Sequence, residues 1–240
     1  MSAAEFGRID RRVVACRRCP ELRAYCAQIA LEKRRSYRDS TYWGKPVPAF
    51  GDPQARVALV GLAPGAHGSN RTGRMFTGDA SGEWLFRALY RAGFASRPDA
   101  SGRDDGLTLR DAIITAAIRC APPKNKPTPR QIASCEPFLD AEFAALRRLR
   151  VVVGLGAIGT RAATDALRRA AYTFERIVPF GHGAESVALG PRERRVILVS
   201  SYHPSRQNTN TGKLTQGMLD AIFARARAHL EDADAHGQDG

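Results

Sequence analysis

Three polar residues that could carry out chemistry follow apolar segments of the sequence. Asp79 stands near the end of a glycine-rich stretch, residues 61–82, that comes after ARVALV; Asn125 stands in RCAPPKNKPTP; and His203 comes directly after RRVILVSSY. A carboxylate can orient water or stabilise a cation, and a histidine can donate to an anion that forms on a leaving group. An amide can both donate to and accept from the edge of a nucleobase. The three residues are candidates for one site if the fold brings their loops together.

The glycine-rich stretch is suited to bring backbone N–H groups close to a ligand. Gly61, Gly65 and Gly68 lack the side chains that would keep a ligand away from the main chain. Ala63 precedes a proline and is therefore biased towards an extended conformation. We expect a backbone pocket in this loop, with Gly61, Ala63 and Gly65 in contact with the substrate.

The same stretch contains an aromatic ring and two basic residues. Phe76 can stack on a flat ligand, and Arg71 and Arg74 would keep the Asp79 carboxylate ionised. The alternative is structural, with Asp79 capping the following helix and Phe76 filling the core. For these two residues taken alone, the structural explanation is the commoner one.

Asn125 and His203 have structural explanations as well. Asn125 could be a turn residue between prolines, and a single histidine at the end of a strand is often structural. The polar, lysine-bearing loop after His203, which leads into a helix, makes the functional interpretation more specific.

The chain has five cysteines, and in a reducing compartment these are expected to be thiols or metal ligands. Cys16 and Cys19 form CRRC, whereas Cys120 and Cys135 flank a proline-rich segment. Four cysteines could hold zinc as readily as an iron–sulfur cluster. Cys26 is left over and can be explained as a small apolar core residue.

The elements that must position these residues alternate between strand and helix. Strands are predicted at ARVALVGL, DAIITAAIR, RVVVGLG and RRVILVSSYHPS, with helices between them, the first capped by Ser81. This order predicts an α/β fold with a central parallel four-stranded sheet flanked by helices. In such folds ligands bind at the carboxyl ends of the strands, so the loops after the four strands should converge.

One of these loops, GLGAIG from Gly154, matches a dinucleotide-binding pattern. The acidic residue expected about twenty positions later should end a second strand, but the segment around Glu175 does not have that character. We therefore interpret these glycines as a tight turn between strand and helix.

The composition favours polyanionic partners, since 37 lysines and arginines against 24 acids give a net charge of +13. The alternative is a basic protein without a nucleic-acid partner. The sequence begins without an apolar leader and contains no run long enough to cross a membrane, which predicts a cytoplasmic protein. We expect one domain over residues 1–230 and a disordered acidic tail over residues 231–240.

Taken together, these motifs resemble the uracil-DNA glycosylase superfamily, specifically its family 5, the B-type enzymes. The resemblance rests on three ordered segments, GLAPGAHGSNRTGRMFTGDASG, RCAPPKNKPTP and HPSRQNTNTG, and with the cysteines it runs from about Cys16 to the final helix. It implies a monofunctional enzyme that hydrolyses the N-glycosidic bond of uracil in DNA and leaves an abasic site for base excision repair.

The resemblance also implies roles for individual residues. Four cysteines match the ligands of a [4Fe-4S] cluster, with Cys26 outside it: Cys16, Cys19, Cys120 and Cys135. The catalytic aspartate, the stacking aromatic, the asparagine that contacts the base and the histidine after the last strand match Asp79, Phe76, Asn125 and His203. Many members of the superfamily place a polar residue at the position of Ala63 to activate water, so in this chain that task passes to Asp79.

Substrate range and DNA contacts follow from the same comparison. Related iron–sulfur glycosylases have an asparagine where this chain has Ala116, so hypoxanthine and xanthine are expected beside uracil. The expected partner is double-stranded DNA with deaminated bases, with single-stranded DNA as a further candidate. Predicted DNA contacts come from the first and last loops, with Leu214 as an apolar wedge: Arg71, Arg74, Ser205, Arg206, Lys213 and Leu214.

Three other functions remain open at this stage. A non-catalytic iron–sulfur DNA-binding module would bind damaged DNA without releasing a base. A nicotinamide-dependent oxidoreductase built on GLGAIG would bind cofactor without a preference for DNA, and a zinc protein would be colourless.

Overall fold

The centre of the fold is a sheet whose middle strands are short apolar runs. The computed structural model describes residues 3–235. Its middle strands are β2 (Val57–Gly61), β3 (Ala112–Ala116), β4 (Val151–Leu155) and β7 (Arg195–Ser201). They run parallel in the order β3-β2-β4-β7. Every residue of β2, β3 and β4 is buried, as expected for parallel strands covered on both faces.

Three antiparallel strands complete the sheet at its two edges. They are β1 (Phe50–Gly51) beside β3, β6 (Glu185–Leu189) beside β7, and β5 (Thr173–Phe174) beside β6. The sheet therefore has seven strands in the order β1-β3-β2-β4-β7-β6-β5, and the prediction of four was too low. The α/β class and the parallel arrangement of the four predicted strands are confirmed.

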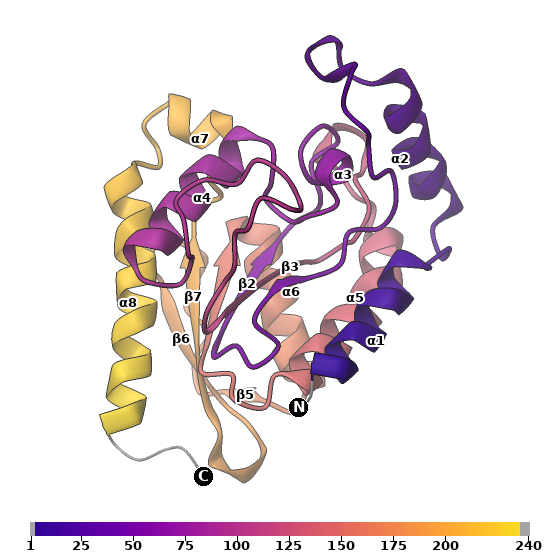
Figure 1. Cartoon of the computed structure of the whole chain (residues 1–240). Helices are drawn as coiled ribbons and strands as arrows, with labels where there is room; N and C mark the ends of the chain where they lie inside the picture. Colours follow the sequence, from indigo (N-terminus) through magenta and orange to yellow (C-terminus); the bar gives the residue numbers. More distant parts are fainter. Residues whose placement is uncertain (1–2, 236–240) are drawn as a thin grey trace.

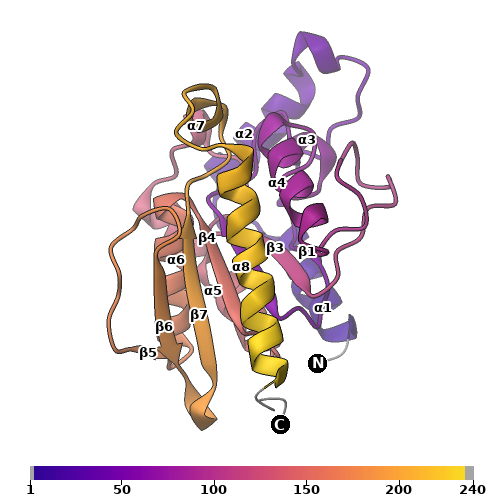
Figure 2. The ribbon, with the colours of Figure 1, turned by 90° about the vertical axis from the view of Figure 1, so that its left-hand side faces the viewer.

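Helices cover both faces of the sheet, as Figures 1 and 2 show. One face packs against α1 (Ala3–Val14), α5 (Pro129–Ala145) and α6 (Gly156–Arg169), and α2 (Pro20–Glu32) extends this layer. The other face packs against α4 (Ala80–Arg91) and α8 (Gln216–Ala235). Two apolar cores thus lie on opposite sides of the sheet, each built from alternate residues of the strands.

The helix boundaries follow local capping signals. Thr128 and Gln131 form a capping box at the start of α5, with the Thr128 hydroxyl accepting from the Gln131 amide. Asp79, rather than the predicted Ser81, caps α4. α8 continues to Ala235, so residues 231–235 of the predicted disordered tail are helical, and residues 236–240 of that tail lie outside the described part of the chain.

The loops that follow the parallel strands converge at one edge of the sheet, near the top of Figure 1. They carry α3 (Ser69–Thr72), the 3₁₀ turn η2 (Pro123–Asn125) and α7 (Arg206–Asn210). The far end of α2 and the 3₁₀ turn η1 (Arg35–Tyr37) rise beside them. A further turn, η3 (Pro191–Glu193), connects β6 to β7. Among the described helices, none is long and apolar enough to cross a membrane.

Candidate active site

A cavity of about 540 Å³ lies at the carboxyl edge of the sheet, where the loops after β2, β3 and β7 meet. We call it the base pocket. The structure brings eight of the predicted site residues to its wall: Ala63, Gly65, Phe76, Asp79, Asn125, His203, Ser205 and Arg206. Three of the four loops that were predicted to converge meet at this cavity, whereas the turn after β4, residues 154–160, does not line it.

Asp79 is held between a helix cap and two glycines. Its Oδ1 accepts a hydrogen bond from the Gly82 amide at 3.1 Å, which fixes the carboxylate at the start of α4. Its Oδ2 lies so close to the glycine-rich loop that a Cβ on Gly65 would be 3.0 Å away and one on Gly68 would be 2.1 Å away. Gly68 is therefore required for the position of this carboxylate. The capping role that we set out as the alternative is confirmed, and the same side chain also lines the base pocket.

Burial raises the pKa of the Asp79 carboxyl above its ordinary value of 3.8. Amide hydrogen bonds from Gly82 and Ser81 and the charge of Arg206 act in the opposite direction, but the loss of solvent has the larger effect. A carboxylate with a raised pKa is a stronger proton acceptor than an ordinary aspartate. The arginine that acts on it is Arg206, on α7, rather than the predicted Arg71 and Arg74.

Phe76 and His203 form one wall of the base pocket. Their ring centroids are 5.6 Å apart, with the planes inclined by 30°. The Phe76 ring lies against β2, because a Cβ on Gly61 would be only 3.0 Å from it. Phe76 has a φ of 52°, a left-handed conformation that costs a residue with a side chain about 1–3 kcal/mol. Gly61 thus contributes to the site by making room for the ring rather than by lining the pocket itself.

His203 is neutral at physiological pH, because burial lowers its pKa to about 4. Its backbone carbonyl accepts hydrogen bonds from the Ser205 amide and from the Asn208 side chain, both at 2.8 Å. Ser205 also caps α7 with its hydroxyl. The start of α7 therefore fixes the position of a neutral imidazole, which can act as a hydrogen-bond donor without carrying charge.

Asn125 and its neighbour Lys124 reach the base pocket from a strained loop. Both have left-handed backbone conformations, with φ of 55° and 54°. Among the described residues, none is hydrogen-bonded to the Asn125 side-chain amide, and that side chain is exposed at the mouth of the pocket. An amide in this setting is free to bond with the edge of a ligand. Lys124 was missed by our sequence reasoning, although KNK gives a local signal of positive charge.

Two predicted DNA contacts are not at the surface. Arg74 is 3% exposed and its guanidinium forms two hydrogen bonds with the Asp105 carboxylate. Leu214 is fully buried in the core under α4 and α8, so it is not available as a wedge. These two predictions were wrong, because in each case burial is decided by residues distant in the sequence.

Arg71 and Lys213 make contacts within the protein. The Arg71 side chain donates to the carbonyls of His67 and Gly78, and its guanidinium lies 4.0 Å from the centroid of the Tyr37 ring. Arg71 therefore shapes the glycine-rich loop. Lys213 is exposed, with its ammonium 4.8 Å from the centroid of the Tyr202 ring.

The cysteines gather on the α1, α2 and α5 side of the sheet. Cys19, at the start of α2, and Cys120, after β3, are buried in the same apolar core as Cys135 of α5, and Cys16 packs against it. Burial raises the pKa of Cys135, and Cys16 and Cys19 raise it further, which indicates that these sulfur atoms lie near one another. Cys26 also belongs to this core, and a hydrogen bond with it raises the pKa of Cys120. In residues 3–235, no group of three or more His, Cys, Asp or Glu side chains is arranged to hold a single metal ion.

The GLGAIG segment packs β4 against α6. A Cβ on Gly154 would be 2.4 Å from the Cα of Thr160, and one on Gly159 would be 2.3 Å from the Val60 carbonyl oxygen. Gly156 has a φ of 80° in the turn itself. The interpretation of these glycines as a tight strand-to-helix turn is confirmed.

Comparison with known proteins relates this geometry to a family. The family model of the uracil DNA glycosylase superfamily matches residues 48–227. A type-5 uracil-DNA glycosylase of Thermus thermophilus is 47% identical over 217 residues, which cover 90% of this chain and 94% of that protein. Type-5 uracil-DNA glycosylases of Pyrobaculum aerophilum and Mycobacterium tuberculosis are 45% and 43% identical, over 90% and 94% of this chain and 90% and 82% of those proteins.

Proposed function

The chain belongs to the uracil DNA glycosylase superfamily and, within it, to the type-5 uracil-DNA glycosylases, and from that premise we propose that the base pocket hydrolyses the N-glycosidic bond of uracil in DNA. The product is an abasic site for base excision repair. The observation that carries the proposal is Asp79, a partly buried carboxylate with a raised pKa, placed beside an aromatic wall and a free amide.

The reaction breaks the bond between the sugar and the base and adds water to the sugar. Positive charge develops on the sugar and negative charge on the departing base. The Asp79 carboxylate stabilises the cation and accepts a proton from the attacking water, and its raised pKa favours that transfer. The negative charge on the base is stabilised by donors on the opposite side of the pocket.

In this proposal the other walls of the base pocket recognise the base. Phe76 stacks on the ring, Asn125 hydrogen-bonds with its edge, and neutral His203 donates to its oxygen as charge develops. A neutral donor suits this role because it stabilises the anion without forming a tight ion pair with the product. The backbone around Ala63 and Gly65 supplies further donors.

The target nucleotide must leave the base stack to enter the pocket, at a cost of a few kcal/mol that is smallest for mispaired bases. Deaminated bases are such bases, and we propose hypoxanthine and xanthine as further substrates. Ala116 is buried at the end of β3 and offers no polar side chain to enforce selectivity for uracil. Duplex DNA is the proposed partner, with single-stranded DNA as a second one, and the proposed compartment is the cytoplasm.

We also propose that the four cysteines at positions 16, 19, 120 and 135 hold a [4Fe-4S] cluster. Their shared core and the electrostatic influence of one sulfur on another fit a group that binds several thiolates. A cluster would supply covalent links among the start of α2, the loop after β3 and α5. In this arrangement its contribution is structural.

The catalytic proposal is tested by replacing Asp79 with Asn and measuring base release from a duplex with one uracil, followed by alkaline cleavage of abasic sites. Removal of the general base should lower the single-turnover rate by about 10²–10⁴-fold. Asn is an equally good helix cap, and it carries no buried charge at neutral pH, so the variant should unfold at the same or a higher temperature.

Asp104→Asn is the matched control, because it removes an exposed carboxylate that lies outside the base pocket. This variant should keep the wild-type rate. If metal-loaded wild type released no base from uracil, hypoxanthine or xanthine DNA while still binding it, the chain would be a non-catalytic DNA-binding module.

The cluster is tested by iron analysis and visible absorbance. Cys120→Ser should lose iron, yellow-brown colour and soluble yield together, whereas Cys26→Ala should keep its iron. Unchanged iron content in Cys120→Ser would remove that residue from the ligand set.

A further inference from the structure

A second cavity of about 400 Å³ continues outward from the base pocket, and we call it the outer groove. The two cavities share six lining residues: Gly65, Asp79, Ser81, Lys124, Asn125 and Arg206. A ligand that fills the base pocket and extends beyond it would therefore enter the outer groove.

The far wall of the outer groove comes from elements outside the three motifs of the base pocket. Tyr25 of α2 and Arg34 and Tyr37 of the segment after α2 line this space together with His67 of the glycine-rich loop. Tyr37 is held in place by the guanidinium of Arg71, 4.0 Å from its ring centroid. The wall thus combines a fixed aromatic ring with a basic side chain.

The charges along the outer groove are unbalanced within the protein. In residues 3–235, no salt bridge involves Arg34, Lys124 or Arg206, and Asp79 is the sole carboxylate on the wall. A buried arginine such as Arg119, by contrast, is paired with a carboxylate, Glu142, at 2.6 Å. Three cations that form no salt bridge, against one carboxylate, leave an excess of positive charge that favours an anionic ligand.

A hydroxyl group lies beside one ring nitrogen of His67. The Arg34 amide donates to the Tyr42 hydroxyl oxygen at 3.4 Å, and this hydroxyl is 3.0 Å from Nδ1 of His67. Burial, followed by the charges of Arg34 and Arg71, lowers the pKa of His67, so the ring is neutral at physiological pH. In the tautomer whose Nδ1 accepts the Tyr42 proton, Nε2 carries the proton of the ring and is a second donor for the groove.

We propose that the outer groove binds the phosphodiester next to the extruded nucleotide, with Arg34 and Nε2 of His67 as its donors and the Tyr37 ring against the neighbouring nucleotide. The inference rests on the proposed function, because a nucleotide whose base fills the base pocket carries a phosphate on each side of its sugar. The DNA strand must continue beyond the base pocket, and the outer groove adjoins that pocket and offers Arg34, Lys124 and Arg206 to its phosphates.

The test combines protein variants with removal of one phosphate charge. Binding is measured on a duplex with a stable abasic-site analogue, in which the phosphate on either side of that site is replaced in turn by an uncharged methylphosphonate. One of the two replacements should weaken binding by wild type about tenfold. Arg34→Gln should show that loss on unmodified DNA and a smaller additional loss than wild type on the methylphosphonate duplex.

Arg35→Gln is the matched control, because Arg35 is the exposed neighbour of Arg34 and lies outside the groove. This variant should lose as much binding as wild type does when the phosphate is replaced by methylphosphonate.

A second pair of variants tests His67. His67→Gln places a donor near the position of Nε2 and should bind within about twofold of wild type, whereas His67→Asn should bind about tenfold more weakly. Equal methylphosphonate losses in wild type and Arg34→Gln, or equal binding by the two His67 variants, would overturn the inference.

The outcomes separate this inference from the proposed function. If wild type releases uracil but wild type and Arg34→Gln show equal methylphosphonate losses, the proposed function stands and the inference is overturned. If Arg34→Gln shows the smaller methylphosphonate loss but wild type releases no base, the phosphate site belongs to a DNA-binding module and the proposed function is overturned.

Discussion

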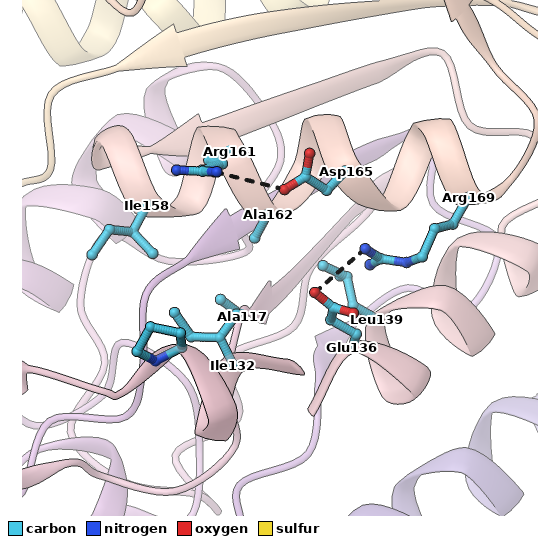
Figure 3. A pocket seen from close by; sticks show the side chains of 10 residues that line it. Ala117, Ile132, Glu136, Leu139, Ile158, Arg161, Ala162, Asp165 and Arg169 are labelled. Atoms are coloured by element: carbon cyan, nitrogen blue, oxygen red, sulfur yellow. Dashed lines mark ion pairs between the residues drawn. The ribbon is translucent and has the colours of Figure 1, made fainter. Parts of the chain in front are cut away.

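The base pocket and a cavity of about 360 Å³ between α5 and α6 differ in how their charged residues are paired. In the α5–α6 cavity, an apolar floor is bordered by Arg161 with Asp165 and by Arg169 with Glu136, at 3.8 and 3.5 Å (Figure 3). In the base pocket, Asp79 and its neighbouring cations form no salt bridge among the described residues. Both cavities are large enough for a small ligand, and the unpaired polar groups of the base pocket distinguish it as the one that is suited to chemistry.

The difference has an energetic reason. A carboxylate that is partly removed from solvent and has no salt-bridge partner reduces stability, and the raised pKa of Asp79 reflects that cost. The charges around the α5–α6 cavity satisfy one another and need no ligand. We therefore expect substitutions around the base pocket to change activity more than stability, and substitutions around the α5–α6 cavity to change neither by much.

The largest change in the rate of base release, and the strongest test of the difference between the two cavities, is expected from one added methyl group. Gly68→Ala places a Cβ where Oδ2 of Asp79 now lies, so the carboxylate must rotate away from its present position. A displacement of about 1 Å can cost about 10²-fold in rate, and we expect a loss of that order in single-turnover base release. Gly102→Ala is the control, because nothing lies within 4 Å of its added Cβ. Wild-type rates in Gly68→Ala would show that the position of Asp79 is not critical.

A smaller effect is expected in the pH profile of base release at saturating enzyme. Asp79 must be ionised to accept a proton, so the rate should rise with pH up to an inflection above the ordinary aspartate value of 3.8 and then level off. Arg206 lowers the pKa of Asp79, and its replacement by Gln should therefore move the inflection to higher pH. Arg161→Gln, at the α5–α6 cavity, should leave the profile in place. An inflection that Arg206→Gln does not move would assign it to another group.

The smallest effect is predicted at the α5–α6 cavity. Arg169→Gln removes its ion pairs with Asp140 and Glu136, which are partly exposed, so the free energy of unfolding in urea should fall by at most about 1 kcal/mol. Base release should remain at the wild-type rate. A large loss of base release would break the comparison and assign a function to the second cavity.

The parallel centre of the fold was predictable because its strands are continuous apolar runs. The edge strands were not: β1 and β5 have two residues each, which is too short for any pattern, and the five residues of β6 are only partly buried. The N-terminal helices α1 and α2 were also not identified from the sequence.

The sequence could predict those site residues whose place in the fold is set by the strand that they follow. Asp79, Asn125 and His203 follow parallel strands, so topology alone places them at one edge. Arg74 could not be placed in this way, because its burial depends on Asp105, thirty-one residues away. Likewise, Arg34 and Tyr37 belong to no motif and reach the outer groove only through the path of the chain after α2.

The two shortest strands also affect how the protein behaves at high concentration. β1 and β5 form the outer borders of the sheet, and each spans two residues. A border this short offers few unpaired backbone donors and acceptors on which a second molecule could add a strand. The short borders therefore reduce the tendency of the sheet to pair edge to edge with the sheet of another molecule.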